Sequence, residues 1–160
     1  MINKKSKEKI IIVDFGSQVT KLIARRIREY KVFCEILTIY QFNNLKDFKN
    51  IKGVILSGGP STVTKKSHPN ISLNIFSKKI PILGICYGLQ LISKNLGGKV
   101  KSVKGRREFG RATLNQVKSS SLTKNFYKRR KATVWMSHQD AVYKLPKKII
   151  AIASTNNSLF

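Results

Sequence analysis

The sequence has few acidic residues, few cysteines and no long apolar run. Only 7 of its 160 residues are Asp or Glu, against 32 Lys and Arg. Its two cysteines, Cys34 and Cys86, lack the CxxC or His-pair spacing of a zinc site or disulfide scaffold. The run from Ile10 to Val13 is too short for a membrane span or a secretory signal. We therefore expect reduced thiols, a cytoplasmic location, no metal and no membrane partner.

The formal net charge of +25 does not by itself identify a nucleic-acid partner. The basic residues are scattered along the chain and form no single stripe. Lys outnumbers Arg, whereas readout of bases and bidentate phosphate contacts favour Arg. We interpret the charge as a solvated surface and keep a nucleic-acid binder as an alternative, which salt-dependent affinity for DNA or RNA would reveal.

Alternating apolar strands and amphipathic helices predict an α/β domain. The sheet is expected to be doubly wound and mainly parallel, with helices on both faces. We expect a basic tail at residues 1–8 and one domain at residues 9–160. Expected strands are residues 10–13, 32–39, 53–57 and 81–85; expected helices are residues 19–27 after a Ser17 cap, 71–76 and 89–96, the last ended by Gly97 and Gly98. Strand candidates at residues 112–117, 132–136 and 149–153 are expected to extend the same sheet.

The segment Gly84-Ile85-Cys86-Tyr87-Gly88 places a cysteine where an expected strand meets an expected helix. A sharp turn there would present the sulfur at the carboxyl edge of the sheet, and the two glycines would let neighbouring chain pass. The positive end of the following helix favours the thiolate. The alternative is an ordinary buried cysteine. The pattern favours a nucleophile at Cys86.

The segment Ser57-Gly58-Gly59-Pro60 ends the preceding strand, so its loop should open at the same edge as Cys86. The Gly59 and Tyr87 amides are then placed to stabilise the oxyanion of a tetrahedral intermediate. Without Cys86 nearby, Gly-Gly-Pro indicates only a turn.

Two histidines remain, and each is interpreted as a local hydrogen-bonding residue. His138 lies in Trp135-Met136-Ser137-His138-Gln139-Asp140 after an expected strand, and His68 lies in a Ser-His-Pro loop. A thiol nucleophile needs a neighbouring base or cation, but the sequence does not place His138 beside Cys86.

Taken in order, five segments resemble the class I glutamine amidotransferase domain of glutamine-hydrolysing GMP synthases, over essentially all of the chain from Lys9. The segments are Asp14-Phe15-Gly16-Ser17-Gln18, Leu56-Ser57-Gly58-Gly59-Pro60, Gly84-Ile85-Cys86-Tyr87-Gly88-Leu89-Gln90, Arg107-Glu108-Phe109-Gly110 and Trp135-Met136-Ser137-His138-Gln139-Asp140. The cysteine segment is shared by class I amidotransferases in general, whereas the first, fourth and fifth are more particular to GMP synthases.

The resemblance implies a ligase of purine nucleotide biosynthesis that takes ammonia from glutamine. It assigns Cys86 as the nucleophile that forms a γ-glutamyl thioester, and the Gly59 and Tyr87 amides as the oxyanion hole. It also assigns Gln90, Ser137 and Asp140 to the glutamine pocket. The implied partner is an ATP-pyrophosphatase domain or subunit that aminates adenylated XMP to GMP. ATP and Mg are expected only in that domain, and no cofactor is expected here.

One departure concerns the base. Family members complete a triad with a His-x-Glu segment, and none occurs in these 160 residues. We therefore expect a domain that is incomplete at its C-terminal end and impaired in turnover on its own, unless another chain supplies the segment. The remaining alternative is a non-catalytic module that keeps a glutamine pocket and docks on a synthetase; rapid, Cys86-specific labelling by a glutamine-like electrophile would exclude it.

Overall fold

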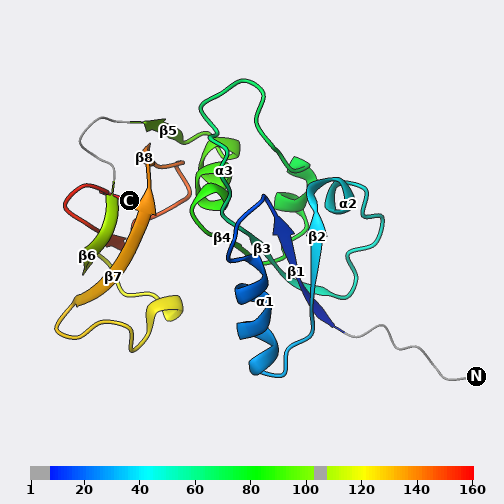
Figure 1. Cartoon of the computed structure of the whole chain (residues 1–160), viewed down its shortest axis with the longest axis horizontal. Helices are drawn as coiled ribbons and strands as arrows, with labels where there is room; N and C mark the ends of the chain where they lie inside the picture. Colours follow the sequence, from blue (N-terminus) through cyan, green and yellow to red (C-terminus); the bar gives the residue numbers. More distant parts are fainter. Residues whose placement is uncertain (1–7, 103–107) are drawn as a thin grey trace, which may run out of the picture. The chain divides into compact units, whose positions relative to one another are not determined.

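The computed structural model describes residues 8–102 and 108–160 (Figure 1). The chain forms two compact units, residues 1–92 and 93–160. The expected basic tail, apart from Glu8, lies outside the described residues, as does Arg107 of the fourth segment. In the described ranges, no helix combines the length and apolar character needed to cross a membrane.

The first unit is built on a parallel sheet of four strands in the order β2-β1-β3-β4 (Figure 1). The β-branched run of β1 places Ile11, Ile12 and Val13 fully in the core, as expected for a parallel strand covered on both faces. Because β2 and β3 flank β1, the strand order reverses there, and ligands bind at the carboxyl ends of strands at such points. The elements are β1 Lys9–Asp14, α1 Thr20–Glu29, β2 Cys34–Thr38, α2 Ile39–Asn43, β3 Ile51–Leu56, the 3₁₀ helix η1 Leu73–Ser77, β4 Ile82–Gly84 and the start of α3 Tyr87–Asn95.

Helices cover both faces of this sheet, so the predicted α/β class and double winding are confirmed. On one face, Ala24 of α1 belongs to a cluster with Ile12 and Ile55. Neighbouring residues in a strand point to opposite faces, so Leu56 faces away from α1. On that second face α3 approaches closely, since a Cβ atom at Gly88 would lie 2.7 Å from the Leu56 Cβ.

The start of α1 differs from the prediction that Ser17 caps it. The N-cap is Val19, and its side chain makes no capping hydrogen bond. Ser17 Oγ instead accepts the Val19 N–H at 3.2 Å. Asp14 Oδ1 accepts both the Gly16 N–H and the Thr20 hydroxyl, so an aspartate at the end of β1 organises this turn. The helix therefore begins at Thr20.

Two other boundaries were predicted less well. The strand expected over residues 32–39 ends at Thr38, because the Thr38 and Gln41 side chains form a capping box that starts α2 at Ile39. The helix expected over residues 71–76 is the single 3₁₀ segment Leu73–Ser77, which Ser72 caps by accepting the Asn74 N–H.

The predicted stop of α3 at Gly97 and Gly98 is confirmed. Gly97 has φ +89°, a conformation that glycine adopts without strain. Its N–H donates to Lys94 O at 3.1 Å, and the Gly98 N–H donates to Ser93 O at 2.7 Å. These two bonds form a Schellman motif, which satisfies carbonyl groups left over at a helix end.

The second unit corrects the expectation that the later strands extend the parallel sheet. Its strands pair antiparallel in two separate sheets, β5-β8 and β7-β6-β9. Burial alternates along β7, so this strand has one exposed face. Parallel strands need cover on both faces, whereas antiparallel pairs tolerate one solvated face. The elements are β5 Lys99–Ser102, β6 Glu108–Gln116, the 3₁₀ helix η2 Ser121–Thr123, β7 Lys131–His138, β8 Asp140–Lys144 and β9 Ala153–Ser154. The candidate at residues 149–153 is thus reduced to a two-residue strand.

Candidate active site

The turn between β4 and α3 has the strand-to-helix geometry predicted for Cys86. Strand β4 ends at Gly84 and helix α3 begins at Tyr87, so two residues make the whole connection. Cys86 has φ +49°, which is the left-handed region that L-residues with a side chain disfavour. Cys86 is exposed, whereas Cys34 is buried with its Sγ donating to Ala24 O. Cys86 is therefore the thiol that solvent can reach.

Both glycines around Cys86 are required by close backbone contacts. A Cβ atom at Gly84 would lie 2.6 Å from the Leu89 nitrogen, and one at Gly88 would lie 2.3 Å from the Leu56 carbonyl oxygen. Real Cβ atoms do not approach backbone atoms this closely. The expected role of small residues on either side of the cysteine is confirmed.

The loop after β3 lies beside Cys86, at the same edge of the sheet. A Cβ atom at Gly58 would be 3.5 Å from the Cys86 Cβ, and the Gly88 N–H donates to Ser57 O at 3.1 Å. Ser57 is fully buried; its Oγ accepts the Phe15 N–H at 3.0 Å and donates to Gly58 O at 2.8 Å. One serine thus joins the ends of β1 and β3 behind the loop.

The two amides assigned to an oxyanion hole lie on these same segments. Gly59 packs against β1, because a Cβ atom there would lie 2.3 Å from the Phe15 carbonyl oxygen. Tyr87 is the first residue of α3, and amides in a first helical turn have no acceptor within the helix. The geometry is compatible with the predicted pair, which stays a prediction.

The Tyr87 side chain anchors the start of α3 in the core. Its ring is 1% exposed and packs against Phe15, with ring centroids 5.1 Å apart. Its hydroxyl donates to Pro69 O and lies 3.3 Å from His68 Nδ1. Burial raises the pKa of Tyr87 to about 12. The interpretation of His68 as a local hydrogen-bonding residue is confirmed.

Of the residues assigned to the glutamine pocket, Gln90 lies in the first unit and the other two in the second. Gln90 is 7% exposed, and its N–H donates to Cys86 O at 3.1 Å. Ser137 lies near the end of β7, and Asp140 is the first residue of β8, on the other side of a bend at Gln139. Gln90 is therefore joined to the Cys86 turn by the structure, whereas the roles of Ser137 and Asp140 stay a prediction.

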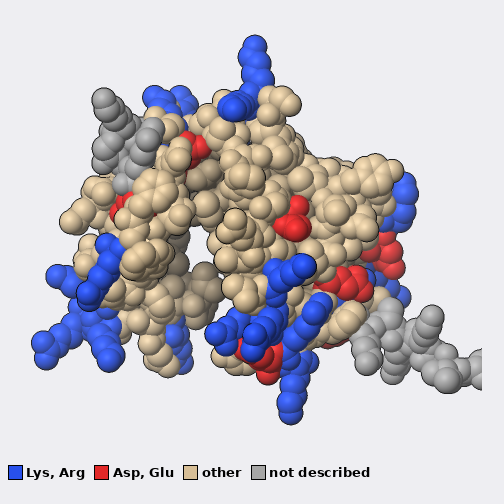
Figure 2. Space-filling view, viewed as in Figure 1, with Lys and Arg blue, Asp and Glu red and all other residues tan. Residues whose placement is uncertain are grey.

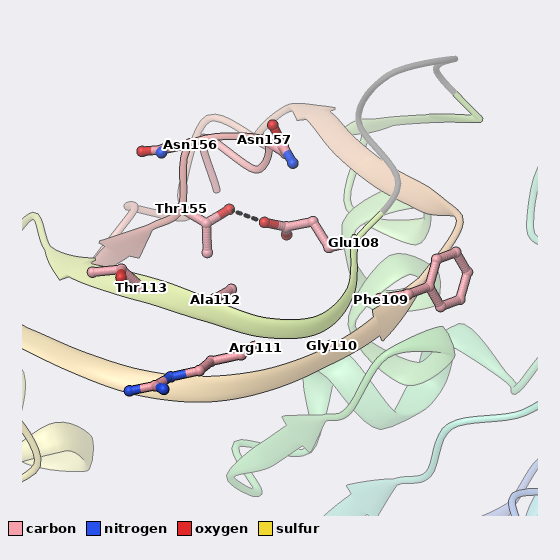
Figure 3. A pocket seen from close by; sticks show the side chains of 9 residues that line it. All are labelled: Glu108, Phe109, Gly110, Arg111, Ala112, Thr113, Thr155, Asn156 and Asn157. Carbon is pink, nitrogen blue, oxygen red and sulfur yellow. Dashed lines mark hydrogen bonds between the residues drawn. The ribbon is translucent and has the colours of Figure 1, made fainter.

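The second unit holds a cluster of buried polar groups that the sequence did not reveal. Glu108 Oε2 lies 3.0 Å from His138 Nε2, and Glu108 Oε1 accepts the Thr155 hydroxyl at 2.6 Å. Figure 3 shows the Glu108 carboxylate directed toward Thr155, beside a cavity of about 360 Å³. The interpretation of His138 as a hydrogen-bonding residue is confirmed. Its partner is 30 residues away in sequence, and no local pattern gives such a pairing.

No metal centre is evident in the described ranges, where no three or more His, Cys, Asp or Glu side chains gather as a ligand group. The chemistry that the described residues support in the first unit is therefore that of an exposed thiol beside two backbone amides.

Comparisons with known proteins agree on one family. The family model described as glutamine amidotransferase class-I matches residues 11–159. A glutamine-hydrolyzing GMP synthase from Prochlorococcus marinus subsp. pastoris is 45% identical over 99% of this chain, and one from Agrobacterium fabrum is 47% identical over 96%. The chain spans only 30% and 29% of those proteins.

Solved structures give the same result for the fold. A protein from Thermoplasma acidophilum, described as belonging to GMP synthase, superposes with a TM-score of 0.76 at 29% identity, over 95% of this chain and 75% of that one. A glutamine amidotransferase from Thermotoga maritima superposes with a TM-score of 0.74 at 21% identity, over 94% of this chain and 69% of that one. The second match bears on the fold alone.

Proposed function

Because this chain belongs to the class I glutamine amidotransferase family, we propose that it is the glutamine-binding and glutamine-cleaving part of a GMP synthase. The observation that supports this most directly is the turn at Cys86. It combines an exposed thiol, a positive φ and a neighbouring glycine loop that brings backbone amides to the same edge of the sheet.

In the proposed reaction, the Cys86 thiolate attacks the side-chain carbonyl carbon of glutamine. The carbonyl oxygen becomes an oxyanion, which the Gly59 and Tyr87 amides stabilise by donating hydrogen bonds. The carbon–nitrogen bond breaks, the nitrogen takes a proton and leaves as ammonia, and a thioester remains. Water then cleaves the thioester to give glutamate and restores the thiol.

Glutamine binding is proposed for Gln90, Ser137 and Asp140. A carboxylate such as that of Asp140 suits the α-ammonium group of an amino acid, and Ser137 and Gln90 offer neutral hydrogen-bonding groups. Ammonia would pass to an ATP-pyrophosphatase domain or subunit that uses ATP and Mg and aminates adenylated XMP. No cofactor is proposed for this chain itself.

Turnover by this chain alone is proposed to be slow, because its 160 residues include no His-x-Glu segment to act as base. Loss of a triad member typically lowers turnover by several orders of magnitude. The first half-reaction with a reactive analogue does not require a leaving amine to be protonated, so labelling of the thiol is the suitable assay.

The test is alkylation by a glutamine analogue that carries a chloroketone in place of the side-chain amide. We expect rapid, saturable modification of Cys86, which L-glutamine slows, and much slower modification of Cys34 by mass spectrometry. Iodoacetamide serves as the reagent without glutamine character, and Cys86→Ala as the matched control. Modification of Cys86 no faster than by iodoacetamide, with no protection by glutamine, would contradict the proposal.

A further inference from the structure

The Glu108 carboxylate is the centre of a buried network in the second unit. Glu108 is 6% exposed, and each of its two oxygens has a partner from a different segment (Figure 3). Burying a carboxylate is unfavourable unless its oxygens are hydrogen-bonded, and charge-assisted bonds of this kind are among the strongest in proteins. The positions of His138 and Thr155 are therefore both tied to this carboxylate.

The Glu108–His138 pair closes one end of the β6–β7 ladder. Glu108 is the first residue of β6, His138 is the last residue of β7, and the two are cross-strand partners. Immediately after His138 the chain bends at Gln139 and joins the other sheet, where Asp140 of β8 pairs with β5. The pair thus lies at the point where the chain leaves one sheet for another.

The third segment is the turn after β9. The Thr155 hydroxyl, which donates to Glu108, also accepts the Ser158 N–H at 2.9 Å, and the Thr155 N–H donates to Ser158 O at 2.8 Å. Thr155 and Ser158 are 5% and 8% exposed. Glu108 therefore connects the start of β6, the end of β7 and a buried C-terminal turn.

We propose that Glu108 is a positioning residue for glutamine binding. Its carboxylate holds the His138 ring through Nε2, and the ring holds the bend that carries Ser137 and Asp140. This inference rests on the proposed function, in which Ser137 and Asp140 bind glutamine. Glu108 itself touches no substrate in this scheme.

The hydrogen bond also determines which ring nitrogen of His138 carries the proton. An ionised carboxylate only accepts, so Nε2 donates to Glu108, and in a neutral ring Nδ1 is left as an acceptor. Nδ1 is buried and has no hydrogen-bond partner in the part of the chain that the structure describes. A competing role for His138, activation of a thiol, follows from the same chemistry and must be separated by experiment.

The test measures the rate of Cys86 alkylation against the concentration of the glutamine chloroketone, using the whole chain. Glu108→Ala is expected to raise the half-saturating concentration about tenfold, since small displacements of binding groups have effects of this size, while the maximal rate changes little. Glu108→Gln keeps an acceptor oxygen and is expected to recover most of the affinity. The rate with iodoacetamide should be the same in all variants.

Glu35→Gln is the matched control, because Glu35 is a more exposed carboxylate of the first unit, 2.7 Å from Lys9 Nζ. Thr155→Val removes one of the two bonds to Glu108, so we expect the half-saturating concentration to rise about twofold to threefold, less than in Glu108→Ala. This variant decides the question if Glu108→Ala does not fold.

Two results would overturn the inference. One is an unchanged half-saturating concentration in folded Glu108→Ala and Thr155→Val. The other is a fall in the maximal rate at unchanged half-saturation, which would assign the Glu108–His138 pair to thiol activation. Failure of the proposed function is distinct from both, because the unmodified chain would then show no preference for the glutamine-like reagent.

Discussion

At the scale of single residues, Cys86 is held in a conformation that its own side chain disfavours. A φ of +49° costs an ordinary L-residue about 1–2 kcal/mol, because Cβ comes too close to the backbone. Strained residues of this kind persist only where their surroundings determine the conformation, and they occur preferentially at functional sites. The strain at Cys86 is therefore a measurable property of the turn.

Comparison of Cys86→Gly with Cys86→Ala measures this strain. Glycine relieves it and alanine keeps it, so the free energy of unfolding should be about 1 kcal/mol higher for the glycine variant, the larger freedom of the unfolded glycine chain offsetting part of the gain. Urea denaturation of the two variants gives the difference. A glycine variant that is no more stable than the alanine variant would show that the turn is relaxed.

Tyr87 gives the second prediction at this scale, a loss of stability at alkaline pH. Its phenol has a pKa of 10.0 in an unfolded chain and of about 12 in the folded one. Between those values the folded state keeps a proton that the unfolded state has released, so rising pH favours unfolding. The contribution is complete below about pH 10 and falls by about 1.4 kcal/mol for each pH unit above it.

The measurement is the difference in free energy of unfolding between the unmodified chain and Tyr87→Phe, at about pH 9 and about pH 11. Other groups titrate alike in both proteins and cancel. An equal pH dependence in the two proteins would mean that the Tyr87 phenol ionises in the fold as readily as in water.

At the scale of elements, the ends of β1 and β3 depend on the Ser57 hydroxyl. It is buried and satisfies the Phe15 N–H, which has no route to water if the hydroxyl is removed. Ser57→Ala should lower the free energy of unfolding by about 1–3 kcal/mol, the usual effect of leaving a buried donor unsatisfied. Ser17→Ala is the control, because its bond to the Val19 N–H is exposed and water can replace it. Equal effects of the two changes in chemical denaturation would refute this role.

The contact between β3 and α3 gives a prediction that separates crowding from backbone strain. Gly88→Ala would place Cβ 2.3 Å from the Leu56 carbonyl oxygen, so α3 must shift and Cys86 with it. In Gly97→Ala the Cβ meets nothing within 4 Å, and only the positive φ is unfavourable. Both should destabilise, by about 1–3 and about 1–2 kcal/mol. Only Gly88→Ala should change the rate of Cys86 alkylation by iodoacetamide; an unchanged rate would place the turn outside the influence of this contact.

The same elements explain what the sequence could predict. The turn at Cys86 follows from adjacent residues: an apolar strand, two glycines and an amphipathic helix occupy one continuous segment. The antiparallel pairing of β6 with β7 depends on a register between distant segments, and a shift by one residue would reverse which side chains are buried. The α/β unit and Cys86 were therefore predictable, whereas the Glu108–His138 contact was not.

At the scale of the whole molecule, the excess of positive charge is the dominant property. The 7 acidic residues can neutralise few of the 32 basic ones, and the salt bridges of Arg25 and Arg26 with Glu29 are exposed. Figure 2 shows Lys and Arg side chains at many separate places on the visible face, with Asp and Glu at few. Exposed pairs contribute little to stability, so self-repulsion should outweigh them.

We therefore expect added salt to stabilise the chain. Raising sodium chloride from about 20 to about 200 mM shortens the range of charge repulsion and should raise the free energy of unfolding by about 1 kcal/mol. Urea denaturation at the two salt concentrations tests this, with glycerol as a solute that carries no charge. Destabilisation by salt would indicate that attractive pairs dominate.

The backbone contacts at Gly59, Gly84 and Gly88 have a consequence for inheritance. Every missense change in a glycine codon adds at least a Cβ atom, and at these three positions that atom would lie within 2.6 Å of a backbone atom of another segment. No replacement amino acid is small enough to be neutral there. A gene encoding this chain can therefore vary at these codons only through synonymous substitutions, whatever the chemistry of the residue that a mutation would introduce.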